Sequence, residues 1–279
     1  MAFKTLTTVY RNPALDDAHL SHATDLARDW NAHLEVLAIG TDHIHPGAFY
    51  AGAGAIAVRD GMDQAIADAK TARDTAMDAL QPTGISWRVH AAVTQMGAMG
   101  QSIAEHAALS DLVILPRPYG DGRNSEDVAI TEAALFSTRT PVLVLPDDAS
   151  PPSNPQKIVI AWNQSAEALA AIRAALPLLK SAELVSIVVI DPPSHDSEHT
   201  DPGSRLAEML SRHDISCEVA ILARTMPNIS DVLMRHAIDI DADLVVMGAY
   251  GHSRLLEAIL GGATRNMLEK CKLPVLMAH

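Results

Sequence analysis

The sequence predicts an α/β protein of two tandem doubly wound domains, each built on a five-stranded parallel sheet. Short runs rich in Val, Ile and Leu alternate with segments of helical apolar spacing, which is typical of parallel sheets covered on both faces. The second half repeats the order of these segments in the first half, which indicates an internal duplication. Residues 146–155 are rich in Pro, Ser and Asp and predict a linker between the copies. We therefore expect domains at 1–146 and 155–279.

The first copy begins with a strand and then alternates helices with strands. Its apolar runs predict strands at 4–10, 34–39, 86–93, 111–115 and 141–145. Its helical spacing predicts helices near 14–30, 59–80, 99–109 and 126–138. Residues 40–58, which contain several His, Pro and Gly residues, predict a mobile or lid-like connection.

The second copy follows the same scheme. It predicts strands at 158–161, 184–190, 216–222, 243–248 and 274–278. It predicts helices at 165–180, 204–213, 229–240 and 264–271. The match to the first copy is direct in places, since Asp111-Leu-Val-Ile-Leu115 corresponds to Asp243-Leu-Val-Val-Met247. Right-handed crossovers between such strands place helices on both faces of each sheet.

Composition excludes several classes of function. The formal net charge is −13, from 34 acidic and 21 basic residues, which argues against a surface that follows nucleic-acid phosphates. Two cysteines give no disulfide framework. The first ten residues resemble a strand rather than a signal peptide, and no apolar run is long enough for a membrane span. We expect a cytoplasmic protein with neither a nucleic-acid nor a membrane partner.

Glycines punctuate the end of the fourth strand in the second half. Gly248 and Gly251 follow the apolar run, and Gly261 and Gly262 precede the next predicted helix. Glycine allows a sharp turn and leaves bare N–H groups at a helix start, where a phosphate can bind. The spacing G-x-x-G-x9-G after a strand resembles the nucleotide-binding signature of the universal stress protein family. That signature continues with Ser or Thr, whereas this chain has Gly262 there and Thr264 two residues later.

The resemblance implies a fold and a ligand. Universal stress proteins have an adenine nucleotide alpha hydrolase-like fold with strand order 3-2-1-4-5, and that order implies a ligand outside the carboxyl ends of strands 1 and 4. The ligand implied is ATP or AMP, with Mg²⁺ as a companion ion. By resemblance the cofactor-binding residues are Asn163, Val189, Met247, Gly248, Gly251, Gly261, Gly262, Ala263 and Thr264.

Each of these residue types also has a purely structural interpretation. Asn163, at the Asp position of the family pattern, and Ser165 either contact a nucleoside or cap the next helix. Apolar residues such as Val189 and Met247 belong to a core more often than to a ligand site. The ring of Trp162 either stacks on a base or fills the base pocket itself. The sequence leaves these alternatives open.

The first half has lost the glycine pattern. Pro116 and Pro118 stand where the second half has its glycines, and Glu126 and Asp127 begin the following helix. Two carboxylates at a helix start satisfy its N–H groups and repel phosphate, so we predict no nucleotide in the first half. Neither half shows a catalytic motif or a closed constellation of metal ligands.

These observations predict a nucleotide-binding regulatory or stress-response protein that is not an enzyme. The alternative is a nucleotide-free scaffold that acts through protein partners. A slow ATPase ranks third, because no general base is evident beside the glycines. The family pairs its domains through the final strand, so residues 141–145 and 274–278 predict an intramolecular pseudo-dimer, and a further homodimer is compatible with this arrangement.

Overall fold

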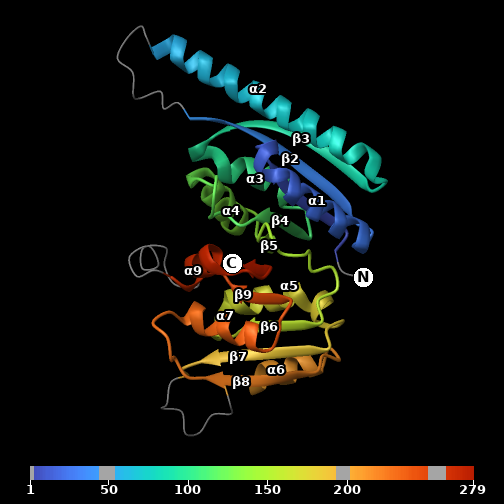
Figure 1. Cartoon of the computed structure of the whole chain (residues 1–279), viewed down its shortest axis with the longest axis vertical. Helices are drawn as coiled ribbons and strands as arrows, with labels where there is room; N and C mark the ends of the chain where they lie inside the picture. The colour runs from blue at the N-terminus through green and yellow to red at the C-terminus, as the bar shows by residue number, and fades with distance from the viewer. Residues whose placement is uncertain (1–2, 44–53, 193–201, 251–261) are drawn as a thin grey trace. The chain divides into compact units, whose positions relative to one another are not determined.

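A computed structural model shows how these elements are arranged (Figure 1). It describes residues 3–43, 54–192, 202–250 and 262–279. The chain divides into two compact units, Phe3–Thr140 and Pro141–His279, which we call the first and the second unit. Within the described residues, no helix combines the length and the apolar composition that a membrane span requires.

The first unit is a parallel sheet with helices packed on it. Its elements in chain order are β1 (Thr5–Tyr10), α1 (Pro13–Trp30), β2 (His33–Asp42), α2 (Gly54–Leu80), β3 (Ser86–Gln95), α3 (Met99–Ala107), β4 (Leu112–Pro116) and α4 (Ser125–Ser137), with 3₁₀ turns at Gln81–Thr83 and Met96–Ala98. The strands lie in the order β3-β2-β1-β4, and every pair is parallel. The long helix α2 packs along β2 and β3 (Figure 1).

The second unit repeats this plan and completes it. Its elements are β5 (Val142–Leu145), β6 (Lys157–Ala161), α5 (Ala166–Leu179), β7 (Leu184–Ile190), α6 (Ser204–Ser211), β8 (Cys217–Leu222), α7 (Ile229–Asp239), β9 (Leu244–Gly248), α9 (Ala263–Lys270) and β10 (Val275–Ala278). The parallel strands lie in the order β8-β7-β6-β9-β10, which is the order 3-2-1-4-5 of the predicted fold class. The predicted fold class is confirmed.

Strand β5 ends the first copy in sequence but belongs to the second unit. It pairs antiparallel with β10, and Leu143 lies opposite Leu276. Both side chains are fully buried. The final strands of the two copies, predicted at 141–145 and 274–278, therefore pair with each other.

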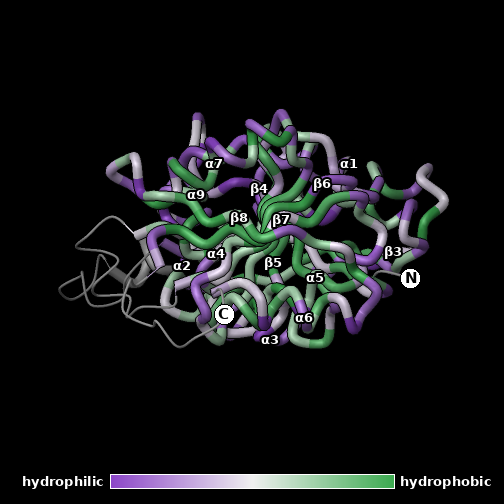
Figure 2. The backbone as a smooth tube through the Cα atoms, turned by 90° about the horizontal axis from the view of Figure 1, so that it is seen from below, coloured by the Kyte–Doolittle hydropathy of each residue, from purple (hydrophilic) through white to green (hydrophobic). Residues whose placement is uncertain are grey.

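The core of each unit consists of the apolar runs that predicted the strands. Ile158, Val159 and Ile160 of β6 are completely buried, as are Leu112, Val113 and Ile114 of β4. Strands buried on both faces show continuous apolar runs rather than alternation, which is why these segments were recognisable. Figure 2 shows the hydrophobic colour along the central strands β6 and β7.

The predicted connection at 40–58 is shorter in the structure. Strand β2 continues to Asp42, and α2 begins at Gly54 rather than near residue 59. Gly40 explains part of the difference, because a Cβ there would lie 1.9 Å from the Ala65 carbonyl oxygen of α2. Gly40 does not begin a loop but allows α2 to pack closely against a strand. The His, Pro and Gly run that predicted a mobile or lid-like connection lies mostly outside the described residues.

Candidate functional site

The residues predicted around a nucleotide gather at one edge of the second unit. Strands β7, β6 and β9 are parallel neighbours, and Ala161 at the end of β6 pairs with Val188 and with Met247. Parallel strands end at the same edge of a sheet, so Asn163, Val189 and Gly248 lie at this carboxyl edge. Gly251 and Gly261 lie outside the described residues.

Asn163 and Ser165 cap the start of α5. The Asn163 side-chain oxygen accepts a hydrogen bond from the Ser165 N–H at 3.1 Å, and the Ser165 hydroxyl oxygen accepts one from the Ala168 N–H at 3.1 Å. Gln164 between them has a φ of 63°, a left-handed conformation that costs a non-glycine residue energy. The structural interpretation of this pair therefore holds in the structure, while Asn163 itself stays exposed.

Val189, Met247 and Gly248 are packed against protein. Val189 and Met247 are each only 6% exposed. A Cβ on Gly248 would lie 2.5 Å from the Ala168 backbone nitrogen, so α5 can approach β9 only because residue 248 is glycine. Close packing of the helix is thus enough to explain this glycine.

The start of α9 carries no side-chain cap, a feature that it shares with the start of α6. Gly262 precedes the helix and offers no capping side chain, and the first turn contains no acidic residue. The buried Thr264 hydroxyl oxygen accepts a hydrogen bond from the Tyr250 N–H at 3.1 Å, which ties the helix start to the segment after β9. Ala263 and Thr264 therefore form a first turn whose N–H groups have no side-chain cap.

The matching helix of the first unit, α4, is capped twice. The Asn124 side-chain oxygen accepts a hydrogen bond from the Glu126 N–H at 2.8 Å, and Asp127 accepts one from the Asn124 N–H at 2.8 Å. Glu126 and Asp127 bring two buried carboxylates to the first turn. In the first unit, protein carboxylates occupy the place of an anion at the helix start.

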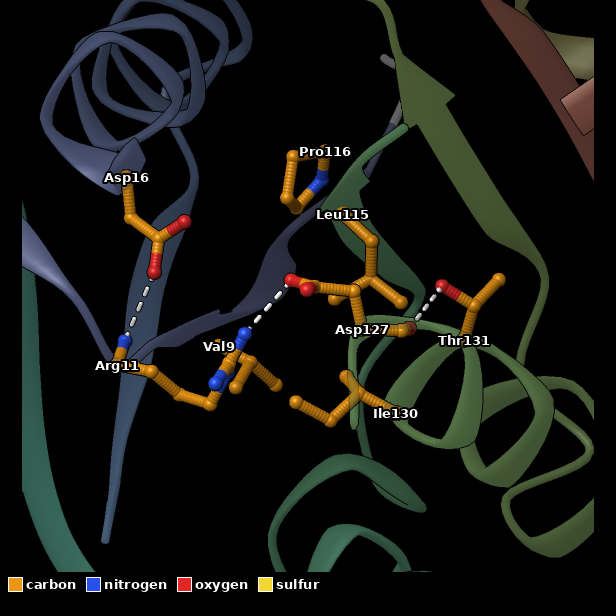
Figure 3. Close-up of a pocket in the computed structure, with 8 residues that line it drawn as sticks. All are labelled: Val9, Arg11, Asp16, Leu115, Pro116, Asp127, Ile130 and Thr131. Carbon is orange, nitrogen blue, oxygen red and sulfur yellow. Dashed lines mark hydrogen bonds and ion pairs between the residues drawn. The ribbon is translucent and has the colours of Figure 1, made fainter. Parts of the chain in front are cut away.

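Arg11 and Arg123 balance these carboxylates. Figure 3 shows Arg11 beside Asp127. Arg11 reaches Glu126 at 2.8 Å and Asp127 at 2.7 Å, and the Arg11 side chain is 13% exposed. Arg123 pairs with Asp16 at 2.7 Å, and both side chains are almost completely buried. The cavity that remains beside Arg11 and Asp127 has a volume of about 10 Å³, which is room for one water molecule.

The surroundings of Asp16 stabilise the charged form of its carboxyl group. Burial alone raises the pKa of its carboxyl group, but the N–H groups of Asn12 and Arg11 and the guanidinium of Arg123 outweigh burial and lower it. Its oxygens accept hydrogen bonds from the Arg11 and Asn12 N–H groups at 3.0 Å each. The Asp16 carboxylate is therefore ionised and hydrogen-bonded at neutral pH.

The strand registers place Arg11 where the second unit has Asn163. Thr5 of β1 pairs with the first residue of β2, and Lys157 of β6 pairs with the first residue of β7, so Arg11 and Asn163 both lie six residues further on. By the same count from the helix starts, Asp127 corresponds to Arg265. The two carboxylates were predicted from the sequence, but Arg11 was not. The basic residue after strand 1 and the acidic residues after strand 4 have opposite charges, and this contrast could have indicated their pairing.

Comparisons with known proteins relate the second unit to a protein family. The model of the universal stress protein family matches residues 154–279. The C-terminal half of the chain is a universal stress protein domain. No curated protein matches the sequence.

Solved structures extend the universal stress protein fold over both units. A universal stress protein from Archaeoglobus fulgidus DSM 4304 is 14% identical with a TM-score of 0.71, and the match covers 98% of this chain and 95% of that one. A structure from Pseudomonas aeruginosa UCBPP-PA14 assigned to the same family is 17% identical with a TM-score of 0.62, and the match covers 99% and 92%. A universal stress protein in complex with cAMP is 22% identical with a TM-score of 0.36, covering 45% of this chain and 98% of that one. The tandem form of the fold rests on the first two structures.

The described residues offer no metal centre. Within them, no three His, Cys, Asp or Glu side chains are placed to hold a metal ion. The C-terminal universal stress domain therefore presents a polar strand end at Asn163 and an uncapped helix start at α9.

Proposed function

We propose that this protein binds an adenine nucleotide, ATP or AMP, at one site in its C-terminal domain and acts in regulation or stress response rather than in catalysis. The observation that carries the proposal is the contrast between α9 and α4. The two helices hold the same place in the two units, yet α4 begins with carboxylates and a capping box, while α9 begins with Gly262 and has neither.

The start of α9 has the chemistry of a phosphate site. An uncapped helix start presents N–H groups and the positive end of the helix dipole. Arg265, which pairs with Glu269 at 2.8 Å, brings a cation to the first turn where the first unit has Asp127. A cation there opposes the helix dipole and favours a nearby anion.

The remaining predicted residues would contact the nucleoside. Asn163 is exposed at the end of β6 and carries an amide that can donate and accept hydrogen bonds. It lies beside the end of β9, so a ligand held at α9 would extend across both strand ends. Mg²⁺ would arrive with the phosphates of ATP rather than at a protein site.

The first unit is proposed to bind no nucleotide. Its helix start already carries Glu126 and Asp127, which Arg11 neutralises at 2.8 and 2.7 Å. A phosphate there would have to displace these carboxylates from Arg11, at the cost of leaving buried charges unpaired.

The proposed action is linked to binding. A nucleotide that bridges the ends of β6 and β9 stabilises the arrangement of those ends that it binds. A protein partner could then distinguish the loaded from the empty domain. The cytoplasm, as the compartment in which this occurs, remains a prediction from the sequence.

The test introduces the chemistry of the first unit into the second. Ala263→Asp places a carboxylate in the first turn of α9, where it suits the helix dipole and should not disturb folding. We expect calorimetric titration to show ATP and AMP binding to the parent protein and a loss of at least about tenfold in affinity in the variant, because the carboxylate repels phosphate.

Ser181→Asp is the matched control for this experiment. It adds the same charge at an exposed residue beyond the end of α5, at the opposite edge of the sheet. Equal losses in the two variants would mean that general charge rather than the start of α9 controls binding. A parent protein that releases no heat with either nucleotide would contradict the proposal.

A nucleotide-free scaffold is the second candidate, and Trp162 favours it. The indole N–H donates to the Pro202 carbonyl oxygen at 3.1 Å, so the ring is held by protein at the carboxyl edge. If the parent protein binds neither nucleotide, function would lie in partner contacts. Slow ATP hydrolysis is the third candidate. It would be supported if the parent protein turned over labelled ATP and the Ala263→Asp variant did not.

A further inference from the structure

The side chain of Trp162 lies on the sheet face that carries α5 and α6. Its backbone N–H donates to the Val188 carbonyl at 2.9 Å, which continues the pairing of β6 with β7 by one residue. That register sets Trp162 beside Val189, and neighbours in a parallel register point to the same face. Ile160, two residues earlier, shares this face and pairs with Ile187.

The indole crosses the end of β7. Gly203, next to Pro202, packs so closely on Val219 of β8 that a Cβ would lie 2.5 Å from the Val219 side chain. Val219 pairs with Ile187 and so lies on the same face. Because β7 lies between β6 and β8, a ring that starts at the end of β6 and bonds to Pro202 must pass over the end of β7.

The residue of β7 in register with Trp162 is Val189. Val189 is 6% exposed although it lies at the edge of the sheet, while its β8 neighbour Ile221 is 53% exposed. Val189 is also one of the residues that the family resemblance predicts around the nucleotide. The strand register and the bond to Pro202 therefore place the protein's own aromatic ring over the apolar surface expected to receive a base.

We propose that Trp162 is the specificity-determining residue of the C-terminal site. Its anchored indole covers the part of the site that would receive the adenine base. A nucleotide therefore binds with both its base and its phosphates only if it displaces the ring. A phosphate chain without a base reaches the start of α9 without displacing the ring. This inference rests on the proposed nucleotide site and deepens it. The parent site consequently discriminates little between ATP and a phosphate chain that lacks a base.

The experiment separates the two ends of the site with two probes. Inorganic tripolyphosphate tests the start of α9, and ATP tests both ends. Both are titrated into the full chain as the parent protein and as Trp162→Ala, Trp162→Phe and Trp87→Ala. Trp87 is a partly exposed tryptophan of β3 in the first unit and serves as the matched control.

We expect Trp162→Ala to bind ATP at least about tenfold more tightly than the parent, while its affinity for tripolyphosphate stays within about twofold. Trp162→Phe keeps a ring but removes the N–H that bonds to Pro202. Losing one hydrogen bond from the anchor predicts a gain for ATP of about fivefold. This conservative variant decides the question if Trp162→Ala does not fold. Trp87→Ala should match the parent for both probes.

Unchanged or weaker ATP binding in both Trp162 variants would overturn the inference, because the ring would then be a bystander or a stacking partner. If neither ATP nor tripolyphosphate binds to the parent or to the variants, the proposed function itself fails. If tripolyphosphate binds and ATP gains nothing, only the role of Trp162 is wrong. The two failures are therefore distinguishable.

Discussion

A buried histidine of α1 makes the stability of the first unit depend on pH. His19 is 3% exposed, and its Nε2 lies 2.9 Å from the Thr8 hydroxyl and 3.3 Å from the Ile114 carbonyl oxygen. Burial lowers the pKa of His19 to about 4 from its ordinary 6.5. Asp16 opposes this shift, whereas Arg123 and His22 add to it. The folded first unit thus keeps a neutral imidazole in the range where an unfolded chain holds a charged one.

This shift predicts an acid-sensitive first unit. The unfolded chain takes up a proton at His19 below pH 6.5, but the folded chain does so only near pH 4. Stability therefore falls as the pH drops through that window, by roughly 3 kcal/mol in total. Thermal unfolding at pH 7 and pH 5 should show a smaller loss in His19→Gln than in the parent protein.

Asp16 acts in a different window, which keeps the test specific. The pKa of its carboxyl group is lowered from 3.8, so the stability it contributes is present above pH 3.8 and is lost only at lower pH. A parent protein that loses no more stability between pH 7 and pH 5 than His19→Gln would contradict the role of His19.

At the scale of elements, the start of a helix distinguishes the two units. Helix α4 and helix α9 follow corresponding strands, and their first turns differ in chemistry. The sequence predicted both helices from apolar spacing, which does not depend on capping. The cap, by contrast, decides what can bind at the helix start.

The side chain that caps α4 should stabilise it measurably. Asn124→Ala removes the acceptor of the Glu126 N–H bond, and we expect it to lower the free energy of unfolding by about 1 kcal/mol. Asn228→Ala is the matched control, because the Asn228 side chain accepts no cap bond from the backbone of α7 and instead donates to the Asp231 carboxylate at 2.8 Å. Urea unfolding of both variants checks this. Equal effects would show that the cap bond of Asn124 is not what stabilises the helix.

At the scale of the whole molecule, the boundary between the two sequence copies does not coincide with the boundary between the two compact units. Strand β5 follows the elements of the first copy, yet it pairs with β10, and its residues fall in the second unit. The predicted domain limits of 1–146 and 155–279 remain predictions. The pairing of β5 nevertheless shows that one strand of the first copy adds an antiparallel strand to the sheet of the second.

Because β5 lies in the second unit, we predict that it stabilises the strands of that unit. Leu143→Ala in β5 should leave a cavity opposite Leu276 at a cost of about 2–5 kcal/mol. We expect faster hydrogen–deuterium exchange in peptides from β10 and little change in peptides from β1. The control, Leu112→Ala in β4, should speed exchange in β1, its partner. Faster exchange in β1 than in β10 after Leu143→Ala would contradict the assignment.

The sequence by itself determined the alternation of strands and helices, the duplication, the family of the C-terminal half and the loss of the glycine pattern in the first half. These features lie in local composition and period, which a single segment carries. Its errors at 40–58 arose because glycine serves close packing as well as loops.

Only the tertiary structure decided which residues meet. Arg11 and Glu126 are 115 residues apart in the chain, and the direction of the Trp162 ring depends on Pro202, which lies 40 residues away. Strand β5 likewise finds its partner in β10 across the linker. Such pairings depend on strand order and register, which bring distant side chains to one edge of a sheet, and no local pattern of residues encodes them.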